Sequence, residues 1–197
     1  GHNTDGDLAS SGTLLKRMPF QADATLRNDI NNGDVLFIDQ HLSKTAQLTA
    51  KNYNNKIDIA IIEVAQILED GSLILTTSVG NNLSFLDLAD KIIIEVNTKI
   101  PTSIRGIHDL YLSNTKKNDL HKIDTADTRI GNEFVKIDTN KIVAIVFTDI
   151  QDESAEIATI DQNTQSIANH IIDFLKSEVE KGKLTNALKP LQCGIGK

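Results

Sequence analysis

The chain has 197 residues, 40% of them hydrophobic, with a net charge of −7 and a single cysteine. This length and composition suit one globular core and exclude disorder as the expected state. The acidic balance argues against nucleic-acid binding, which needs a basic face, but it does not exclude a small anionic ligand. Cys193 excludes an intramolecular disulfide framework and fits a reducing compartment.

Targeting signals are not evident in the chain. The apolar runs are far shorter than the roughly 20 residues of a membrane helix, and the polar first residues show no signal peptide. We therefore expect a cytoplasmic protein that does not act at a membrane, with the mitochondrial matrix as the alternative in a eukaryote.

The first quarter of the chain predicts three short helices and one strand. Asp23 is a plausible N-cap, and Asn32-Gly33 is a good stop for the helix between them. The apolar run VLFID predicts a buried strand, and Ser43 should start the next helix. The expected helices span 5–16, 24–31 and 44–51, and the strand spans 35–39.

The middle of the chain holds the clearest strands, at 59–62 and 92–94. The turn signal Glu69-Asp70-Gly71 should join the first of these, within the apolar stretch 57–68, to a return strand at 72–76 as a hairpin. Ser84 is expected to cap a short helix over 85–90. A polar, irregular excursion follows at 102–138, and loops of this length usually carry function.

The last third predicts a buried strand and the longest helix. The strand is IVAIVFT at 142–148, and the helix starts at Asp161 or Thr164 and runs to about Lys181, before Gly182. Its apolar residues recur at helical spacing, so one face is expected to pack on the sheet. Strands alternating with helices predict an α/β fold, a three-layer α/β/α arrangement whose mostly parallel sheet is mixed because of the hairpin.

Two loops of this sheet could carry chemistry. The loop 76–82 has three hydroxyl side chains, Gly80 and two amides before a helix, so it could hold an anion or a carbonyl oxygen, or it could be an ordinary strand-to-helix turn. His108-Asp109 could be an acid–base pair, or a structural loop in which Asp109 caps a turn, since neighbours on an extended segment point apart.

Other candidates are weaker. Glu63 and Glu95 lie late in apolar strands, where a carboxylate is a buried base or, more often, is paired. The histidines show no ligand spacing, so no metal is expected. Cys193 lacks a partner, and 194–197 (GIGK) is not a P-loop, because position 191 is Leu and no Ser or Thr follows.

Ordered segments along nearly the whole chain resemble the acetyl-CoA hydrolases and the succinate- or acetate-type CoA-transferases. No single segment is diagnostic, but their order and spacing together are specific. They are residues 17–21 (RMPFQ), 37–43 (FIDQHLS), 69–71 (EDG), 76–81 (TTSVGN), 94–97 (IEVN), 106–111 (GIHDLY), 129–131 (RIG), 141–146 (KIVAIV), 165–174 (QSIANHIIDF) and 191–196 (LQCGIG).

The resemblance implies a CoA-transferase-like fold and a reaction through a glutamyl-CoA thioester. A family Gly-x-Gly motif, here Gly194-Ile195-Gly196, supplies a backbone N–H to an oxyanion hole, and Ile195 is the residue that would provide it. The other residues that it places in the acyl pocket are Ser78, Gly80, Asn81, His108 and Asp109.

The resemblance further implies that 1–197 is an N-terminal half, clipped near both ends, and that the nucleophilic glutamate lies in a second half beyond Lys197. The chain alone should then show no turnover. CoA is a substrate, no separate cofactor or metal is expected, the partners are an acyl-CoA and a small carboxylate, and the intact enzyme should be a homodimer. The alternative is a non-catalytic acyl-CoA-binding or assembly module of the same fold, and a sugar-phosphate isomerase is a weaker third hypothesis.

Overall fold

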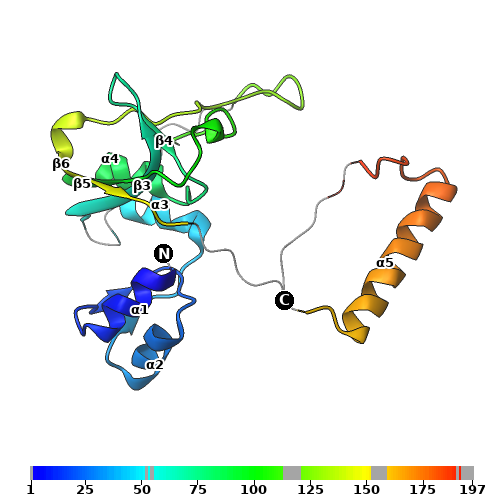
Figure 1. Cartoon of the computed structure of the whole chain (residues 1–197), viewed down its shortest axis with the longest axis horizontal. Helices are drawn as coiled ribbons and strands as arrows, with labels where there is room; N and C mark the ends of the chain where they lie inside the picture. The colour runs from blue at the N-terminus through cyan, green and yellow to red at the C-terminus, as the bar shows by residue number, and fades with distance from the viewer. Residues whose placement is uncertain are drawn as a thin grey trace. The chain divides into compact units, whose positions relative to one another are not determined.

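The computed structural model describes residues 2–51, 53, 56–112, 121–151, 159–189 and 191. The chain divides into two compact units, Gly1–Asp152 and Glu153–Lys197. The first unit contains both the sheets and most of the helices, and the second contains one long helix (Figure 1).

The main sheet has four strands in the order β4-β3-β5-β6 (Figure 1). Their bounds are Ile59–Ile67 for β3, Leu73–Leu75 for β4, Lys91–Asn97 for β5 and Ile142–Thr148 for β6. β3, β5 and β6 are parallel, and β4 is antiparallel to β3. This confirms the predicted α/β class with a mixed, mostly parallel sheet.

The hairpin between β3 and β4 forms at the predicted turn. Gly71 has a φ of +80°, a backbone conformation that glycine adopts without a Cβ clash. The N–H of Ser72 donates to Asp70 Oδ1 at 3.0 Å, and this hydrogen bond lowers the pKa of the Asp70 carboxyl. Local turn chemistry therefore sets the hairpin, as the sequence indicates.

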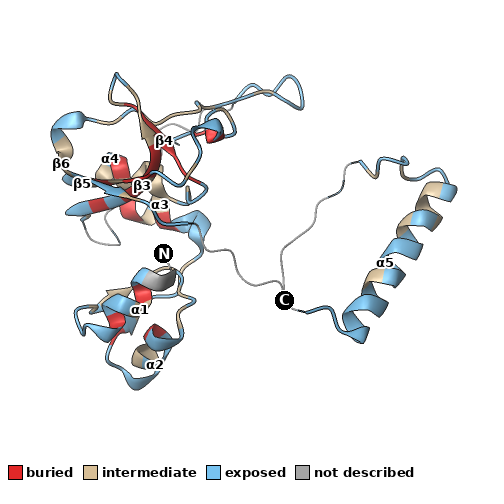
Figure 2. Cartoon of the chain, in the orientation of Figure 1, coloured by how far each residue is buried: buried red, intermediate tan, exposed pale blue. Residues whose placement is uncertain are grey.

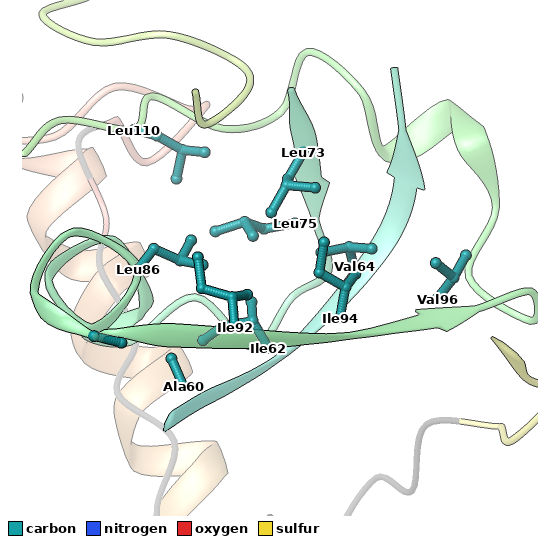
Figure 3. Packing of buried hydrophobic residues seen from close by; sticks show 11 residues of the cluster. Ala60, Ile62, Val64, Leu73, Leu75, Leu86, Ile92, Ile94, Val96 and Leu110 are labelled. Carbon is teal, nitrogen blue, oxygen red and sulfur yellow. The ribbon is translucent and has the colours of Figure 1, made fainter. Parts of the chain in front are cut away.

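One face of the main sheet carries the largest core. Alternate residues of β3 and β5 point to this face, and helix α4 (Asn82–Leu88) covers it through Leu86 (Figure 3). The strand residues in this core include Ala60, Ile62, Val64, Ile92, Ile94 and Val96, with Leu73 and Leu75 from β4. Period-two alternation therefore builds the core as expected for a sheet with a covered face.

Among the described residues, cover on the opposite face lies near the strand ends. There Ala65 and Ile74 pack with Ile104 of the short 3-10 helix η1 (Thr102–Ile104). Earlier in β3, Ile59 and Ile61 are exposed, whereas β4 is buried throughout (red in Figure 2). A second 3-10 helix, η2 (Thr139–Lys141), immediately precedes β6.

The chain before α3 forms a small cluster of its own. It contains α1 (His2–Ser10) and α2 (Ala24–Asn32), with the strands β1 (Lys16–Arg17) and β2 (Leu36–Phe37), whereas α3 (Leu42–Ala50) contacts α4. Asp23 caps α2 by accepting from the Leu26 N–H at 2.9 Å, and Gly33 ends it with a φ of +87°. Both of these predictions are confirmed.

The prediction of a buried strand over 35–39 is wrong. β2 has only two residues, and Leu36 is 60% exposed. In the described chain it pairs with β1 in a sheet of two strands, and within 35–39 Val35 alone is buried, packed with Ala9 and Leu26. Helix α1 also begins earlier and ends earlier than the predicted 5–16.

The prediction of a buried strand over 142–148 is right about the strand and wrong about its burial. β6 has β5 as its one neighbour in the described sheet, so it forms the sheet's edge. Val143, Val146 and Phe147 are exposed as a result. An apolar run indicates a strand, but its burial depends on neighbours that the run does not specify.

The bounds of the long helix α5 (Gln162–Glu180) agree closely with their prediction. The expected burial of its apolar face is wrong, because no residue of α5 is buried and Ile167, Ile171 and Phe174 are 60%, 54% and 62% exposed. Asp161 is the N-cap, because its Oδ1 accepts from the Thr164 N–H at 2.7 Å. This settles the choice between Asp161 and Thr164. Gly182 follows the helix with a φ of +71°, as expected for a glycine just past a helix end.

Candidate functional site

The loop 76–82 connects β4 to α4 and begins at a buried residue. Thr76 is 1% exposed, whereas Ser78 and Gly80 are exposed, and Gly80 has a φ of +42°. The side chain of Asn82 donates to the carbonyl oxygen of Ser78 at 2.7 Å. The loop is therefore anchored at its start and braced from within, while its tip faces solvent.

The expected cap at Ser84 is wrong, because α4 begins two residues earlier. Asn81 occupies the N-cap position without a side-chain capping bond, and the Asn82 N–H donates to the Val79 carbonyl at 2.9 Å. The turn at Val79–Asn82 starts the helix before Ser84 is reached. Asn81 instead directs its amide toward the carbonyl of Leu42, at 3.5 Å.

Thr76 is joined to two polar residues of the sheet through Glu63. The Thr76 hydroxyl donates to Glu63 Oε2 at 2.9 Å, and Asn97 Nδ2 donates to Glu63 Oε1 at 2.8 Å. Asn97, the last residue of β5, is 3% exposed. This polar group places the start of the loop beside the end of β5, at the edge where α/β sheets commonly bind ligands.

His108 lies against the same threonine. The ring is 9% exposed, and Nε2 lies 3.0 Å from the Thr76 carbonyl oxygen. A carbonyl can only accept, so Nε2 carries a proton in this contact, and in the neutral tautomer Nδ1 is the acceptor. Nδ1 is buried and has no partner among the described residues.

Asp109 points away from His108 and caps the turn at 130–131. Its two carboxylate oxygens accept from the backbone N–H groups of Gly131 at 2.7 Å and of Ile130 at 3.2 Å. Of the two interpretations that the sequence left open, the hydrogen bonds of Asp109 match the turn cap. They leave no contact that would make His108-Asp109 an acid–base pair within the described residues.

Arg129 binds the other side of this segment. Its guanidinium donates to the carbonyl oxygen of His108 at 2.8 Å and to that of Gly106. Arg129, Asp109 and Gly131 together clamp the backbone that carries His108. Two segments singled out by the resemblance, 106–111 and 129–131, are thus in direct contact.

The predicted site residues are therefore only partly brought together. Thr76 joins the loop that carries Ser78, Gly80 and Asn81 to His108. Asp109 is the chain neighbour of His108. Gly194, Ile195 and Gly196, with Cys193, lie outside the described residues.

Sequence reasoning missed three residues of this arrangement, Thr76 as a junction, Asn97 and Arg129. The segments 94–97 and 129–131 were singled out by the resemblance, but no role followed from them. Their contacts with Glu63, Ile150, Gly106, His108 and Asp109 span 21 to 53 positions of the chain, so no local spacing could indicate them. Glu95, the register partner of Glu63, accepts from the Thr148 hydroxyl at 2.9 Å. It is therefore a paired carboxylate, the more common of the two interpretations that the sequence offered.

A pocket of about 250 Å³ lies elsewhere, between α4 and the segment before β6. It is lined by Leu83, Leu86 and Asp87 on one side and by Phe134, Val135 and Lys141 among others. None of the predicted acyl-pocket residues lines it. Lys141 Nζ closes part of its rim by donating to the Asp87 carbonyl at 2.8 Å.

Among the described residues, no group of His, Cys, Asp or Glu could hold a metal ion. No described helix is long and apolar enough to cross a membrane.

The geometry defines an α/β domain with an exposed hydroxyl- and glycine-containing loop, beside the strand ends and next to a buried histidine. Comparison with known proteins gives the family. Residues 2–147 match the acetyl-CoA hydrolase/transferase N-terminal domain, and the chain belongs to this family.

Its relatives include enzymes of both kinds. The chain is 38% identical over 197 residues to the succinyl-CoA:acetate CoA-transferase of Clostridium kluyveri, covering 100% of this chain and 37% of that protein. It is 38% identical over 203 residues to the acetyl-CoA hydrolase of Schizosaccharomyces pombe, covering 100% of this chain and 39% of that protein. The chain thus spans less than two fifths of the length of these two relatives.

A solved structure supports the fold. RipA from Yersinia pestis matches with a TM-score of 0.51 and 15% sequence identity, over 84% of this chain and 33% of that chain. At this identity the likeness concerns the fold alone.

Proposed function

We propose that this chain is the N-terminal part of an acyl-CoA transferase or acetyl-CoA hydrolase. The intact protein would move CoA between an acyl-CoA and a small carboxylate, or hydrolyse the thioester with water. The observation that carries the proposal is the family match over residues 2–147, with homologues of both activities that span the whole chain.

The proposed reaction is nucleophilic catalysis by a carboxylate outside residues 1–197. A glutamate attacks the acyl-CoA carbonyl, the C–S bond breaks, and CoA leaves as a thiolate while an acyl–glutamyl anhydride forms. The thiolate then attacks the glutamyl carbonyl of the anhydride, which releases the acyl group as a carboxylate and leaves a glutamyl-CoA thioester. A second carboxylate reverses these steps, whereas water completes a hydrolysis.

Within this scheme the chain supplies an oxyanion donor and part of the acyl pocket. The backbone N–H of Ile195, between Gly194 and Gly196, would donate to the developing oxyanion. Ser78, Gly80, Asn81, His108 and Asp109 would shape the pocket. The contact between His108 and Thr76 supports this assignment, because it joins the two segments that carry all five residues.

His108 would serve as an acceptor in this pocket, since its Nε2 contacts the Thr76 carbonyl and its Nδ1 has no partner among the described residues. Asp109 would contribute through the backbone that it fixes. CoA enters as a substrate, and the scheme requires no further cofactor. A cytoplasmic homodimer remains part of the proposal.

The test uses the intact protein with acetyl-CoA, in the presence and absence of succinate. Release of CoA thiol without succinate indicates hydrolysis, and formation of succinyl-CoA indicates transfer. Borohydride added after acetyl-CoA should reduce a glutamyl thioester to an alcohol on one glutamate, which peptide mass spectrometry would locate. A sample without acetyl-CoA is the control.

The absence of both turnover and a reduced glutamate would contradict the proposal. Binding of acetyl-CoA without turnover would then favour the alternative, a non-catalytic acyl-CoA-binding module. Reduction of Glu63 or Glu95 would contradict the assignment of the nucleophile to a position outside this chain.

A further inference from the structure

The Glu63 carboxylate on β3 is held at both oxygens by buried donors. Oε2 accepts from the Thr76 hydroxyl at 2.9 Å, and Oε1 accepts from Asn97 Nδ2 at 2.8 Å. Thr76 and Asn97 are 1% and 3% exposed. Hydrogen bonds to an ionised carboxylate are among the stronger ones, so these two contacts fix its orientation.

Asn97 is the fixed side of this arrangement. Its amide nitrogen has two protons, and the second goes to the Ile150 carbonyl at 2.8 Å. Its Oδ1 accepts from the Lys99 N–H at 3.1 Å. Asn97 thereby ties Glu63 to the turn after β5 and to the chain that follows β6.

Thr76 is the side that leads to the loop. Its hydroxyl donates its one proton to Glu63, so the hydroxyl oxygen can act as an acceptor for another group. The Ser78 N–H donates to this oxygen at 3.2 Å. Its carbonyl oxygen accepts from His108 Nε2 at 3.0 Å. A shift of Thr76 would therefore move both the Ser78 backbone and the His108 ring.

We propose that Glu63 is a positioning residue that transmits the rigidity of the sheet to the acyl pocket. Its carboxylate sets the place of Thr76, and Thr76 sets the places of Ser78 and His108. This inference rests on the proposed function, in which Ser78 and His108 contact the acyl group. Glu63 does not act as a base here, since both of its oxygens already accept from fixed donors.

Glu95 provides a matched control for Glu63. The two residues are register partners on neighbouring parallel strands, so both lie on the same face of the sheet. Glu95 accepts from the Thr148 hydroxyl at 2.9 Å, at the end of β6 and outside the loop. A neutral amide at either position removes the same charge from the same face.

The experiment compares Glu63→Gln with Glu95→Gln in the intact protein. Glutamine offers one acceptor oxygen and one donating amide, so it cannot accept from both Thr76 and Asn97. We expect Glu63→Gln to lower kcat/KM for acetyl-CoA by about tenfold or more at a temperature where the protein is folded. Glu95→Gln should stay within about twofold of the wild type, within the range of a surface change.

A second readout follows the loop directly. The ¹⁵N–¹H signal of the Ser78 amide and the ring ¹⁵N signals of His108 should shift in Glu63→Gln and stay in place in Glu95→Gln. Thr76→Val keeps the side-chain shape and deletes the hydroxyl, so it should reproduce both effects if Glu63→Gln does not fold.

The outcomes separate the two proposals. If the wild-type protein has no turnover, the proposed function fails, and the Ser78 and His108 signals still test the positioning. If Glu63→Gln matches Glu95→Gln in kcat/KM, or if both signals stay unchanged, the positioning role is overturned. Equal losses of thermal stability in both variants, with a loss of kcat/KM only in Glu63→Gln, support it.

Discussion

The Nε2 atom of His108 lies 3.0 Å from the carbonyl oxygen of Thr76, 32 positions earlier in the chain. This contact joins the loop after β4 to the segment after η1. Because the carbonyl cannot donate, Nε2 carries a proton in this contact, and the neutral ring then has its proton on Nε2. The buried Nδ1 is then an acceptor that a ligand donor could use.

The ring nitrogens of His108 should report this single tautomer. In ¹⁵N spectra at neutral pH, we expect Nε2 to carry the proton and Nδ1 to show the signal of an unprotonated ring nitrogen. The exposed His41 is the control, because nothing described fixes its tautomer and an average signal is expected. A His108 ring with a proton on Nδ1 and none on Nε2 would contradict the contact with Thr76.

Replacement of Asp109 should affect stability through the turn at 130–131. Asp109→Ala removes the acceptor for two backbone N–H groups and should lower the free energy of unfolding by about 1 kcal/mol, because the site is exposed to solvent. Asp109→Asn keeps one acceptor oxygen and should cost less. Urea unfolding measures both. An Asp109→Asn variant that keeps the wild-type stability but loses activity would instead favour an acid–base role for His108-Asp109.

The sequence predicted the elements that local chemistry decides. Asp23 and Gly33 bound α2, the turn at Gly71 forms the hairpin, and Asp161 caps α5. In each case the residue acts on backbone groups within a few positions of itself. Such contacts can be inferred from spacing alone.

What the sequence could not predict depends on distant partners. The run VLFID suggested a buried strand, yet β2 finds only β1 as a neighbour and Leu36 is exposed. In the site, the resemblance marked the segments, but the roles of Thr76, Asn97 and Arg129 arise from contacts more than ten residues apart. Alternation places Glu63 and Glu95 on one face without showing that they have different partners.

The start of α5 should become less stable in acid. The backbone hydrogen bond from Thr164, followed by that from its side chain, lowers the pKa of the Asp161 carboxyl. A lowered folded-state pKa means that this stabilisation is present above the usual value of about 3.9. It is lost as the pH falls through the lowered value.

Hydrogen exchange of the first turn of α5 measures this effect. Protection should fall as the pH drops below about 4, after correction for the intrinsic exchange rate. Asp161→Asn keeps an N-cap acceptor without the titration, so its protection should not show this loss. A wild-type profile identical to that of Asp161→Asn would contradict the capping assignment.

Gly131 should be one of the least replaceable residues in the first unit. A Cβ on it would lie 2.1 Å from the carbonyl oxygen of Leu110, whose backbone pairs with Asn132 in an antiparallel bridge. Gly131→Ala must therefore open this bridge, at a cost of roughly 2–4 kcal/mol in the free energy of unfolding. Gly12→Ala is the matched control, because Gly12 has a φ of +67° but open space around its Cβ position, and it should cost about 1 kcal/mol. Urea unfolding of both variants measures the two losses in the free energy of unfolding. Equal losses would mean that the backbone near Leu110 shifts at little cost and does not hold the segment that carries His108.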